Sequence, residues 1–287
     1  MSGYLPDHTG AQAAVRIARV LEAWGEARFP VDVDGLALHC AETYGWPDPI
    51  TRIHGEDWDG IEGALLPNPG AQEWWILYNT RSTPGRQRFT KAHEFGHYLL
   101  HRHLQARFQC GSGGLWERDS GQSDLEAQAN QFASYLLMPA HHVRARLQGQ
   151  LATIGLLGEL ASFYGVSLEA MCLKFVQITD LRAVLVYWDN GFLKWCVPSR
   201  KARLTRARYP RSAALIEPPP GSLAGDASIR QEWQGRRMPA QAWFPTESPH
   251  ARLREMKHAS DVHERVLSLL ILPEAEAPWE RETDDTD

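Results

Sequence analysis

The amino-acid sequence predicts an α+β fold, and three observations support this prediction. Apolar residues recur at helical spacing over residues 88–101 and 124–138. Apolar runs bounded by turn-forming residues indicate strands at residues 60–66 and 74–78. The turn-forming sequence Asp189-Asn190-Gly191 lies between two further strand-like runs, as expected for a β-hairpin. Together these patterns predict helices combined with small sheets.

These elements group into three consecutive parts and a tail. Residues 1–145 are predicted to form a domain of helices with a small sheet, and residues 146–178 a short unit that resembles a helix-turn-helix. Residues 179–273 are predicted to form a C-terminal α+β unit, and the acidic residues 274–287 a disordered tail. The 287 residues leave room for one large domain or two modest ones, and an apolar content of 43% is ample for a core.

The first part begins with two predicted helices, at residues 11–24 and 33–44, and Gly45 ends the second. A turn rich in proline then joins the two strands. The edge of the second strand, residues 74–79, is a candidate docking site for an extended peptide. Residues 104–123 are rich in Gly, Ser and Gln and are predicted to form a surface loop.

Beyond residue 139 the sequence predicts shorter elements. Residues 151–176 hold two short helical patterns, with Ser167 as the N-cap of the second. Residues 199–220 combine basic residues with three consecutive prolines and are interpreted as an exposed connection. Strands are predicted at residues 183–188, 192–197, 235–244 and 266–272.

Composition narrows the class of protein. The net charge of -5 gives no overall signature of nucleic-acid binding. The four cysteines show no CxxC spacing, which favours reduced structural thiols over disulfides. No secretory signal pattern is visible at the N-terminus, and no stretch approaches the ~20 apolar residues needed to span a bilayer. We therefore expect a soluble cytoplasmic protein without membrane contact.

The pentapeptide His93-Glu94-Phe95-Gly96-His97 lies within the helix predicted at residues 88–101. Residues four apart share one face of a helix, so the two histidines can direct ring nitrogens at one point. Two imidazoles make half of a tetrahedral zinc site. Glu94 is placed to act on a water molecule at such a site without being a ligand itself. A chance match is disfavoured, because polar groups beside an apolar stripe need buried partners and a metal supplies them.

A catalytic zinc site needs a third protein ligand, with the fourth position left to water. The best candidate is Glu126, near the start of the helix predicted at residues 124–138. Asn130 lies one turn further along the same face and can hydrogen-bond the far nitrogen of a ligating histidine. Asp124 is the competing carboxylate, but a helix-capping role is favoured for it. Two histidines and one carboxylate suit Zn2+, and also Mn2+ or Fe2+.

The two motif helices together resemble the ImmA/IrrE family of zinc metallopeptidases. The first matches the pattern RFTxAHExGHxLLH at residues 88–101, and the second matches ExxANxFAxxLLMP at residues 126–139. Both patterns are long, and they occur in the order and at the separation seen in the family. The resemblance extends from about residue 33 to residue 139 and weakens towards residue 176. Family members often carry a second glutamate two residues after the ligand, where this chain has Gln128.

The resemblance implies a zincin-like domain in which His93, His97 and Glu126 bind zinc and Glu94 is the general base of peptide hydrolysis. It also implies a regulatory endopeptidase whose protein substrate is a helix-turn-helix transcriptional repressor, with a role in stress response or in control of mobile elements. For His101 a surface or packing role is favoured. The residue that stabilises the oxyanion stays open among Tyr135, His101, His103, His141 and His142.

Two other classes of function stay open. One is a DNA-binding regulator that uses residues 151–176 and the basic run at residues 200–211 to contact phosphates. The negative net charge, and Lys174 as the only basic residue of the second helix in that pair, make direct nucleic-acid binding the less favoured interpretation. The other is a partner-sensing regulator that retains a structural or vestigial zinc site, in which case hydrolysis is not its function.

Overall fold

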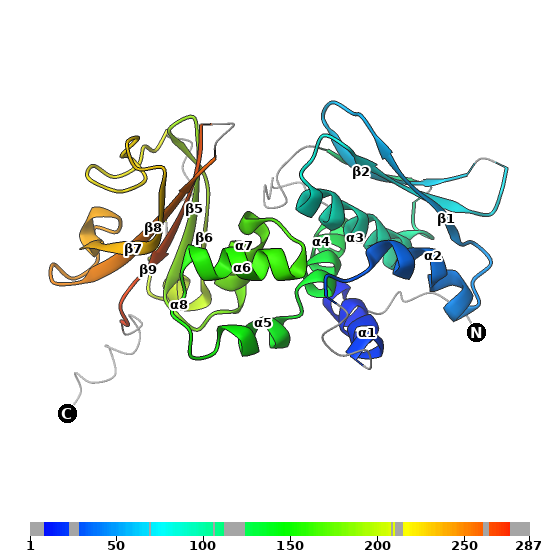
Figure 1. The fold of residues 1–287 in the computed structure, drawn as a ribbon, viewed down its shortest axis with the longest axis horizontal. Helices are drawn as coiled ribbons and strands as arrows, with labels where there is room; N and C mark the ends of the chain where they lie inside the picture. Colours follow the sequence, from blue (N-terminus) through cyan, green and yellow to red (C-terminus); the bar gives the residue numbers. More distant parts are fainter. Residues whose placement is uncertain are drawn as a thin grey trace. The chain divides into compact units, whose positions relative to one another are not determined.

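The computed structural model describes residues 9–22, 29–68, 70–105, 107–111, 124–207, 209, 215–260 and 264–275. The chain divides into two compact units, each with its own sheet. Unit 1 comprises Met1–His142 and Ala161–Ser167, and unit 2 comprises Val143–Leu160 and Leu168–Asp287. Both combine helices with strands, so the predicted α+β class is confirmed (Figure 1). The boundaries expected after residues 145, 178 and 273 stay predictions.

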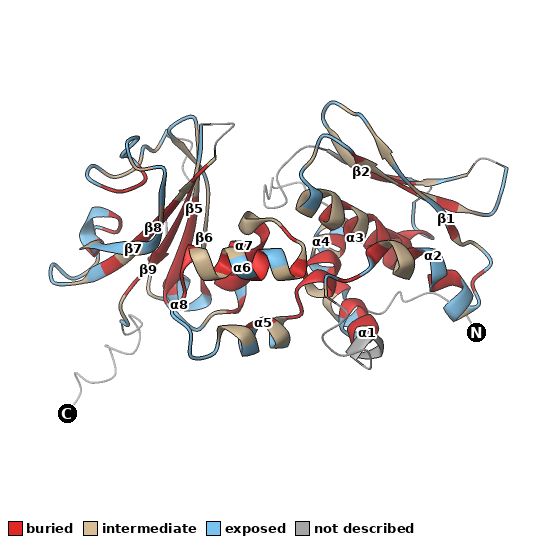
Figure 2. Cartoon of the chain, viewed as in Figure 1, coloured by how far each residue is buried: buried red, intermediate tan, exposed pale blue. Residues whose placement is uncertain are grey.

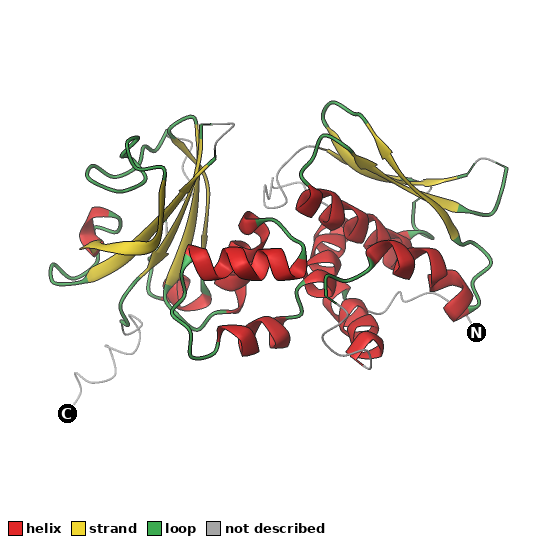
Figure 3. Cartoon of the chain, viewed as in Figure 1, coloured by secondary structure: helices red, strands yellow, loops and turns green. Residues whose placement is uncertain are grey.

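Unit 1 packs helices on one side of a four-stranded sheet (Figure 3). Its strands are β1 (Ile50–Glu56), β2 (Ile61–Pro67), β3 (Trp74–Asn79) and β4 (Phe108–Gly111), in the order β1-β3-β2-β4. Its helices include α1 (Gly10–Glu22), α2 (Val33–Tyr44), α3 (Pro84–His101) and α4 (Asp124–Leu137). α3 packs against β2 and β3, so the motif helix lies directly on the sheet.

The helices of unit 1 agree well with the sequence. α2 spans the predicted residues, because the Asp32 carboxylate accepts a hydrogen bond from the amide of Gly35 and the chain turns at Gly45. α3 begins four residues before the apolar pattern does, with Pro84 in its first turn, where a missing amide proton costs nothing.

The structure differs from the expectations for three strands of unit 1. β1 was not predicted, since most of its residues are exposed or half-buried and show no apolar run. β4 lies inside the segment predicted as a loop, because its antiparallel pairing with β2 makes these four residues a strand. β3 lies between β1 and β2, so the expectation that its edge accepts a peptide is wrong. The edges of this sheet are β1 and β4.

α3 and α4 approach each other closely, and Figure 2 shows buried residues along both helices. The rings of Phe95 and Phe132 meet edge to face, with centroids 5.6 Å apart. Gly96 permits this approach, because a Cβ there would lie 3.0 Å from Phe132 Cδ1 and 3.3 Å from Ala129 Cα. α1 also packs against α4. Apolar packing therefore sets the position of α4 relative to the motif histidines.

Unit 2 is built on a five-stranded antiparallel sheet in the order β6-β5-β9-β8-β7. Its strands are β5 (Ala183–Asp189), β6 (Phe192–Pro198), β7 (Gln231–Pro239), β8 (Arg252–Ala259) and β9 (Arg265–Ile271). The remaining helices of the chain, of which α5 and α6 belong in part to unit 1, are α5 (Ala140–Leu147), α6 (Ile154–Tyr164), α7 (Leu168–Ile178), α8 (Arg200–Leu204) and the 3-10 helix η2 (Ala240–Ala242). The predicted hairpin is confirmed: β5 pairs with β6, and the left-handed conformations of Asn190 and Gly191 form its turn.

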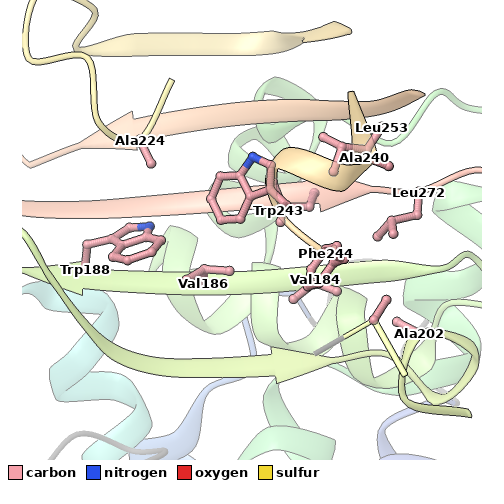
Figure 4. Packing of buried hydrophobic residues seen from close by; sticks show 12 residues of the cluster. Val184, Val186, Trp188, Ala202, Ala224, Ala240, Trp243, Phe244, Leu253 and Leu272 are labelled. Atoms are coloured by element: carbon pink, nitrogen blue, oxygen red, sulfur yellow. The ribbon is translucent and has the colours of Figure 1, made fainter. Parts of the chain in front are cut away.

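One face of this sheet carries a buried apolar core (Figure 4). Trp188 from β5 and Trp243 after η2 pack together in it, with ring centroids 6.0 Å apart. Ala202 of α8 and Ala207 are also buried in this cluster. The interpretation of residues 199–220 as an exposed connection is therefore wrong for these positions, because their small side chains fit against the sheet.

β8 was not predicted, and β7 lies at residues 231–239 instead of 235–244. Charged residues interrupt the apolar pattern of β8, yet Glu255 and Lys257 are buried. The Glu255 carboxylate accepts hydrogen bonds from the amide of Ala224 and the indole of Trp243. Lys257 donates to the carbonyl of Asp226. These contacts offset the cost of burying two charged groups.

Three further expectations concern the chain as a whole. Within the described residues, no single helix has the length and apolar composition needed to cross a bilayer; the bent pair α6 and α7 passes that test only when taken together. The thiols of Cys40, Cys172 and Cys196 are free. Most of the acidic tail, from residue 276, lies outside the described residues.

Candidate metal centre

Three of the predicted residues, from two helices, converge on one point. On α3, the Nε2 atoms of His93 and His97 lie 3.0 Å apart. On α4, the Glu126 carboxylate lies 3.2 Å from each of these nitrogens, through a different oxygen in each case. One donor atom from each residue lies within 4.8 Å of the others. The fold thus brings Glu126 next to two histidines that lie 29 and 33 positions before it in the sequence.

The donor set fits a zinc ion. Zinc–nitrogen bonds of about 2.0–2.1 Å in a tetrahedral arrangement place neighbouring donors roughly 3.3 Å apart. The observed separations of 3.0 and 3.2 Å are close to that value. Two imidazoles and one carboxylate are also a common ligand set of catalytic zinc sites. The Glu126 side chain is 27% exposed and that of His97 is fully buried, so solvent reaches the Glu126 side of the group more readily.

The far nitrogens of both imidazoles have polar neighbours. Nδ1 of His93 lies 2.9 Å from Oδ1 of Asn130, the contact expected for that residue. An amide oxygen accepts a hydrogen bond there, which leaves the Nε2 lone pair free for a metal. Nδ1 of His97 lies 3.0 Å from Nδ1 of His101. His101 is buried, so a surface role for it is wrong.

Glu94 is fully buried between α3 and the sheet. Its position is marked by Gly63 of β2, where an added Cβ would lie 3.0 Å from Glu94 Oε1. The charge of Glu94 also raises the pKa of His93. Glu94 is not part of the group of three converging donors.

Electrostatics in this group keep the Glu126 carboxylate charged. Burial lowers the pKa of His93, but its hydrogen bond to Glu126 and the charges of Glu94 and Glu126 outweigh burial, so the net shift is upward. Burial lowers the pKa of His97 to about 4 despite its contact with Glu126. Burial raises the pKa of Glu126, but hydrogen bonds to both imidazoles outweigh it and hold that pKa well below its usual range. At neutral pH a metal ion would therefore displace at most one proton, from His93.

The candidate oxyanion residues are spread over the domain. Nδ1 of His142 lies 2.7 Å from the hydroxyl of Tyr164. His103 and His141 are exposed, and Tyr135 is half-buried. Among the described residues, none of these joins the group of three donors. The structure adds Phe108 of β4, whose ring stacks on His97 with centroids 4.4 Å apart. The sequence carries no signal for this contact, because β4 lies in a segment without an apolar pattern.

The fold and this group of donors define a zincin-like domain. Residues 62–175 match the model of the family Peptidase_M78, described as the IrrE N-terminal-like domain. This match to a peptidase family agrees with the resemblance of the two motif helices to the ImmA/IrrE family.

Comparison with other proteins adds information on the fold. No curated protein matches the chain. A solved structure described as a Mycobacterium tuberculosis transcriptional regulator is similar to it, with a TM-score of 0.53 and 15% sequence identity. The similarity covers 93% of this chain and 76% of that one. At this identity the comparison bears on the fold alone.

Proposed function

We propose that this chain is a zinc-dependent metalloendopeptidase that cleaves a helix-turn-helix transcriptional repressor. The observation that supports the proposal most strongly is the placement of the Glu126 carboxylate at 3.2 Å from Nε2 of both His93 and His97. The match of residues 62–175 to the model of a peptidase family supports the reaction class. The repressor as substrate, and a cytoplasmic location where it would be met, are inferred from the resemblance to the ImmA/IrrE family.

Each side chain of the centre has a distinct task in this reaction. A zinc ion held by His93, His97 and Glu126 would polarise the scissile carbonyl and lower the pKa of a water molecule. Glu94 would accept the proton of the attacking water and pass it to the leaving amine. Asn130 would keep the His93 ring in the orientation that binds metal. Mn2+ and Fe2+ suit the same donors, so metal analysis of the protein purified without added metal identifies the ion used.

Glu94→Gln separates metal binding from hydrolysis. The assay incubates the zinc-loaded protein with a small helix-turn-helix repressor from the same organism and looks for one discrete pair of fragments. We expect cleavage by the wild type and none by Glu94→Gln, although the variant binds zinc equally well. Glu159→Gln, on the exposed surface of α6, is the matched control and should cleave normally. Equal cleavage by Glu94→Gln would rule out the proposed mechanism.

The alternative of a DNA-binding regulator is weakened by the burial of α7. A recognition helix must expose one face to enter a DNA groove. Residues 170–176 and Ile178 of α7 are all buried. We therefore expect no tight DNA binding in a gel-shift assay over a salt series. Salt-dependent binding at submicromolar protein would favour the regulator instead.

A partner-sensing role with a vestigial zinc site is tested by the same Glu94→Gln variant in cells. If proteolysis is the function, this variant fails to relieve repression of the target operon. Full biological activity of Glu94→Gln would favour the sensing role.

A further inference from the structure

His101 lies behind His97, on the side away from the metal centre. Nε2 of His97 faces His93 and Glu126, at 3.0 and 3.2 Å. The other ring nitrogen, Nδ1, lies 3.0 Å from Nδ1 of His101, one turn further along α3. Because the two nitrogens of an imidazole point in different directions, His101 cannot bind the same metal ion. It acts on the centre only through His97.

Gln128 connects this pair to α4. Its side-chain Oε1 lies 3.5 Å from Nε2 of His101. An amide oxygen accepts a hydrogen bond, so it places the proton of His101 on Nε2 and leaves the lone pair on Nδ1. That lone pair accepts the Nδ1 proton of His97. The Nε2 lone pair of His97 is then directed at the metal centre.

Packing alone does not select this orientation of His97. The Phe108 ring stacks on the His97 ring at an interplanar angle of 21°, which limits tilting. A half-turn about the bond between Cβ and Cγ keeps the ring in the same plane and nearly the same shape, but it exchanges Nε2 with a carbon. Only a polar contact distinguishes the two orientations. His101 is the neighbour that provides such a contact at Nδ1.

We propose that His101, held by Gln128, is a positioning residue that selects the orientation of His97 in which Nε2 binds the metal. This inference rests on the proposed zinc site and extends it. α4 would then supply one ligand, Glu126, and the contacts that orient both imidazoles. Asn130 contacts His93 directly, whereas Gln128 acts through His101.

Two substitutions of His101 separate positioning from packing. His101→Phe fills the space but offers no acceptor to His97, whereas His101→Asn is smaller but keeps an oxygen near the place of Nδ1. Loss of a contact that orients a ligand typically weakens metal binding by about 10–100-fold. We expect that loss for His101→Phe and near-normal zinc affinity for His101→Asn, measured by competition with a chelator. A packing role predicts the reverse order.

Gln128 provides a second test that does not alter α3. Gln128→Met keeps the length of the side chain but removes the acceptor, and we expect zinc affinity to fall by up to about tenfold. Gln131→Met is the matched control on the same helix: Gln131 is exposed, and its oxygen accepts from the amide of Ala11. It should bind zinc as the wild type does. Urea denaturation of the metal-free proteins reports whether each variant folds.

The outcomes distinguish this inference from the proposed function. A wild-type protein that binds no zinc would overturn both. Wild-type zinc affinity in His101→Phe and Gln128→Met would overturn the positioning role and leave the zinc site intact, as would weaker binding by His101→Asn than by His101→Phe. If His101→Phe does not fold, the comparison of Gln128→Met with Gln131→Met decides the question.

Discussion

Replacing Gly96 with alanine tests whether the approach of α3 and α4 sets the geometry of the metal centre. An added Cβ would lie 3.0 Å from Phe132 Cδ1 and 3.3 Å from Ala129 Cα. Favourable carbon–carbon contacts are about 3.5–4.0 Å. Ala129 Cα belongs to the backbone, so α4 itself must move by a few tenths of an ångström. Zinc–ligand distances tolerate deviations of only about 0.2 Å, so this movement should disturb the Glu126 ligand.

Two effects of this substitution on stability oppose each other. Alanine is favoured over glycine inside a helix by roughly 1 kcal/mol. Overpacking a core typically costs about 1–3 kcal/mol. The metal-free protein should therefore be between equally stable and about 2 kcal/mol less stable than the wild type. Zinc binding gains nothing from helix propensity, so its affinity should fall about tenfold or more, which equals about 1.4 kcal/mol.

Urea denaturation measures the free energy of unfolding, and competition with a chelator measures the Kd for zinc. Gly158→Ala is the matched control, because an added Cβ at Gly158 in α6 meets no atom within 4 Å. The free energy of unfolding of this control should rise by up to about 1 kcal/mol, and its zinc affinity should not change. Zinc binding by Gly96→Ala that equals the wild type would refute the link between helix packing and metal geometry.

Three further predictions concern the protonation of His93, the packing of Phe132 and the ion pair of Glu247. As the pH falls below the raised pKa of His93, zinc affinity should fall by up to about tenfold per pH unit, because one proton must leave that ring before zinc binds. Competition with a chelator measures the affinity, and a hundredfold fall per pH unit would contradict a single competing proton. Phe132→Ala should lower the free energy of unfolding in urea by about 3–5 kcal/mol, since Phe132 is fully buried, and a loss below about 1 kcal/mol would show that α4 is not held by this ring. In unit 2, Glu247→Gln should lower the free energy of unfolding by about 3–5 kcal/mol. The substitution removes the carboxylate that lies 2.5 Å from the buried guanidinium of Arg182 and leaves that charge without it. An unchanged Tm in thermal unfolding would contradict this prediction.

The residues of the candidate metal centre can largely be predicted from the sequence. The spacing of His93 and His97 follows from one turn of helix, and Glu126 and Asn130 are one turn apart on the other motif helix. Local periodicity is enough to show which side chains share a face. The hairpin turn at Asn190 is local too, since it depends on the left-handed conformations that these residues tolerate.

Other features depend on contacts between distant segments. β4 is a strand because β2 pairs with it, and β3 is an interior strand because β1 lies beside it. Burial of Glu255 in β8 depends on donors supplied by Ala224 and Trp243. None of these partners is visible in the local pattern of the residues concerned.

The sequence by itself determined the fold class and the residues of the candidate centre, because helix geometry links spacing to a shared face over a few residues. Only the tertiary structure decided that Gln128 of α4 contacts His101 and that Phe108 covers the ring of His97. Those contacts depend on how α3, α4 and β4 pack together. Close packing is a property of the folded chain as a whole, and periodicity within one segment does not encode it.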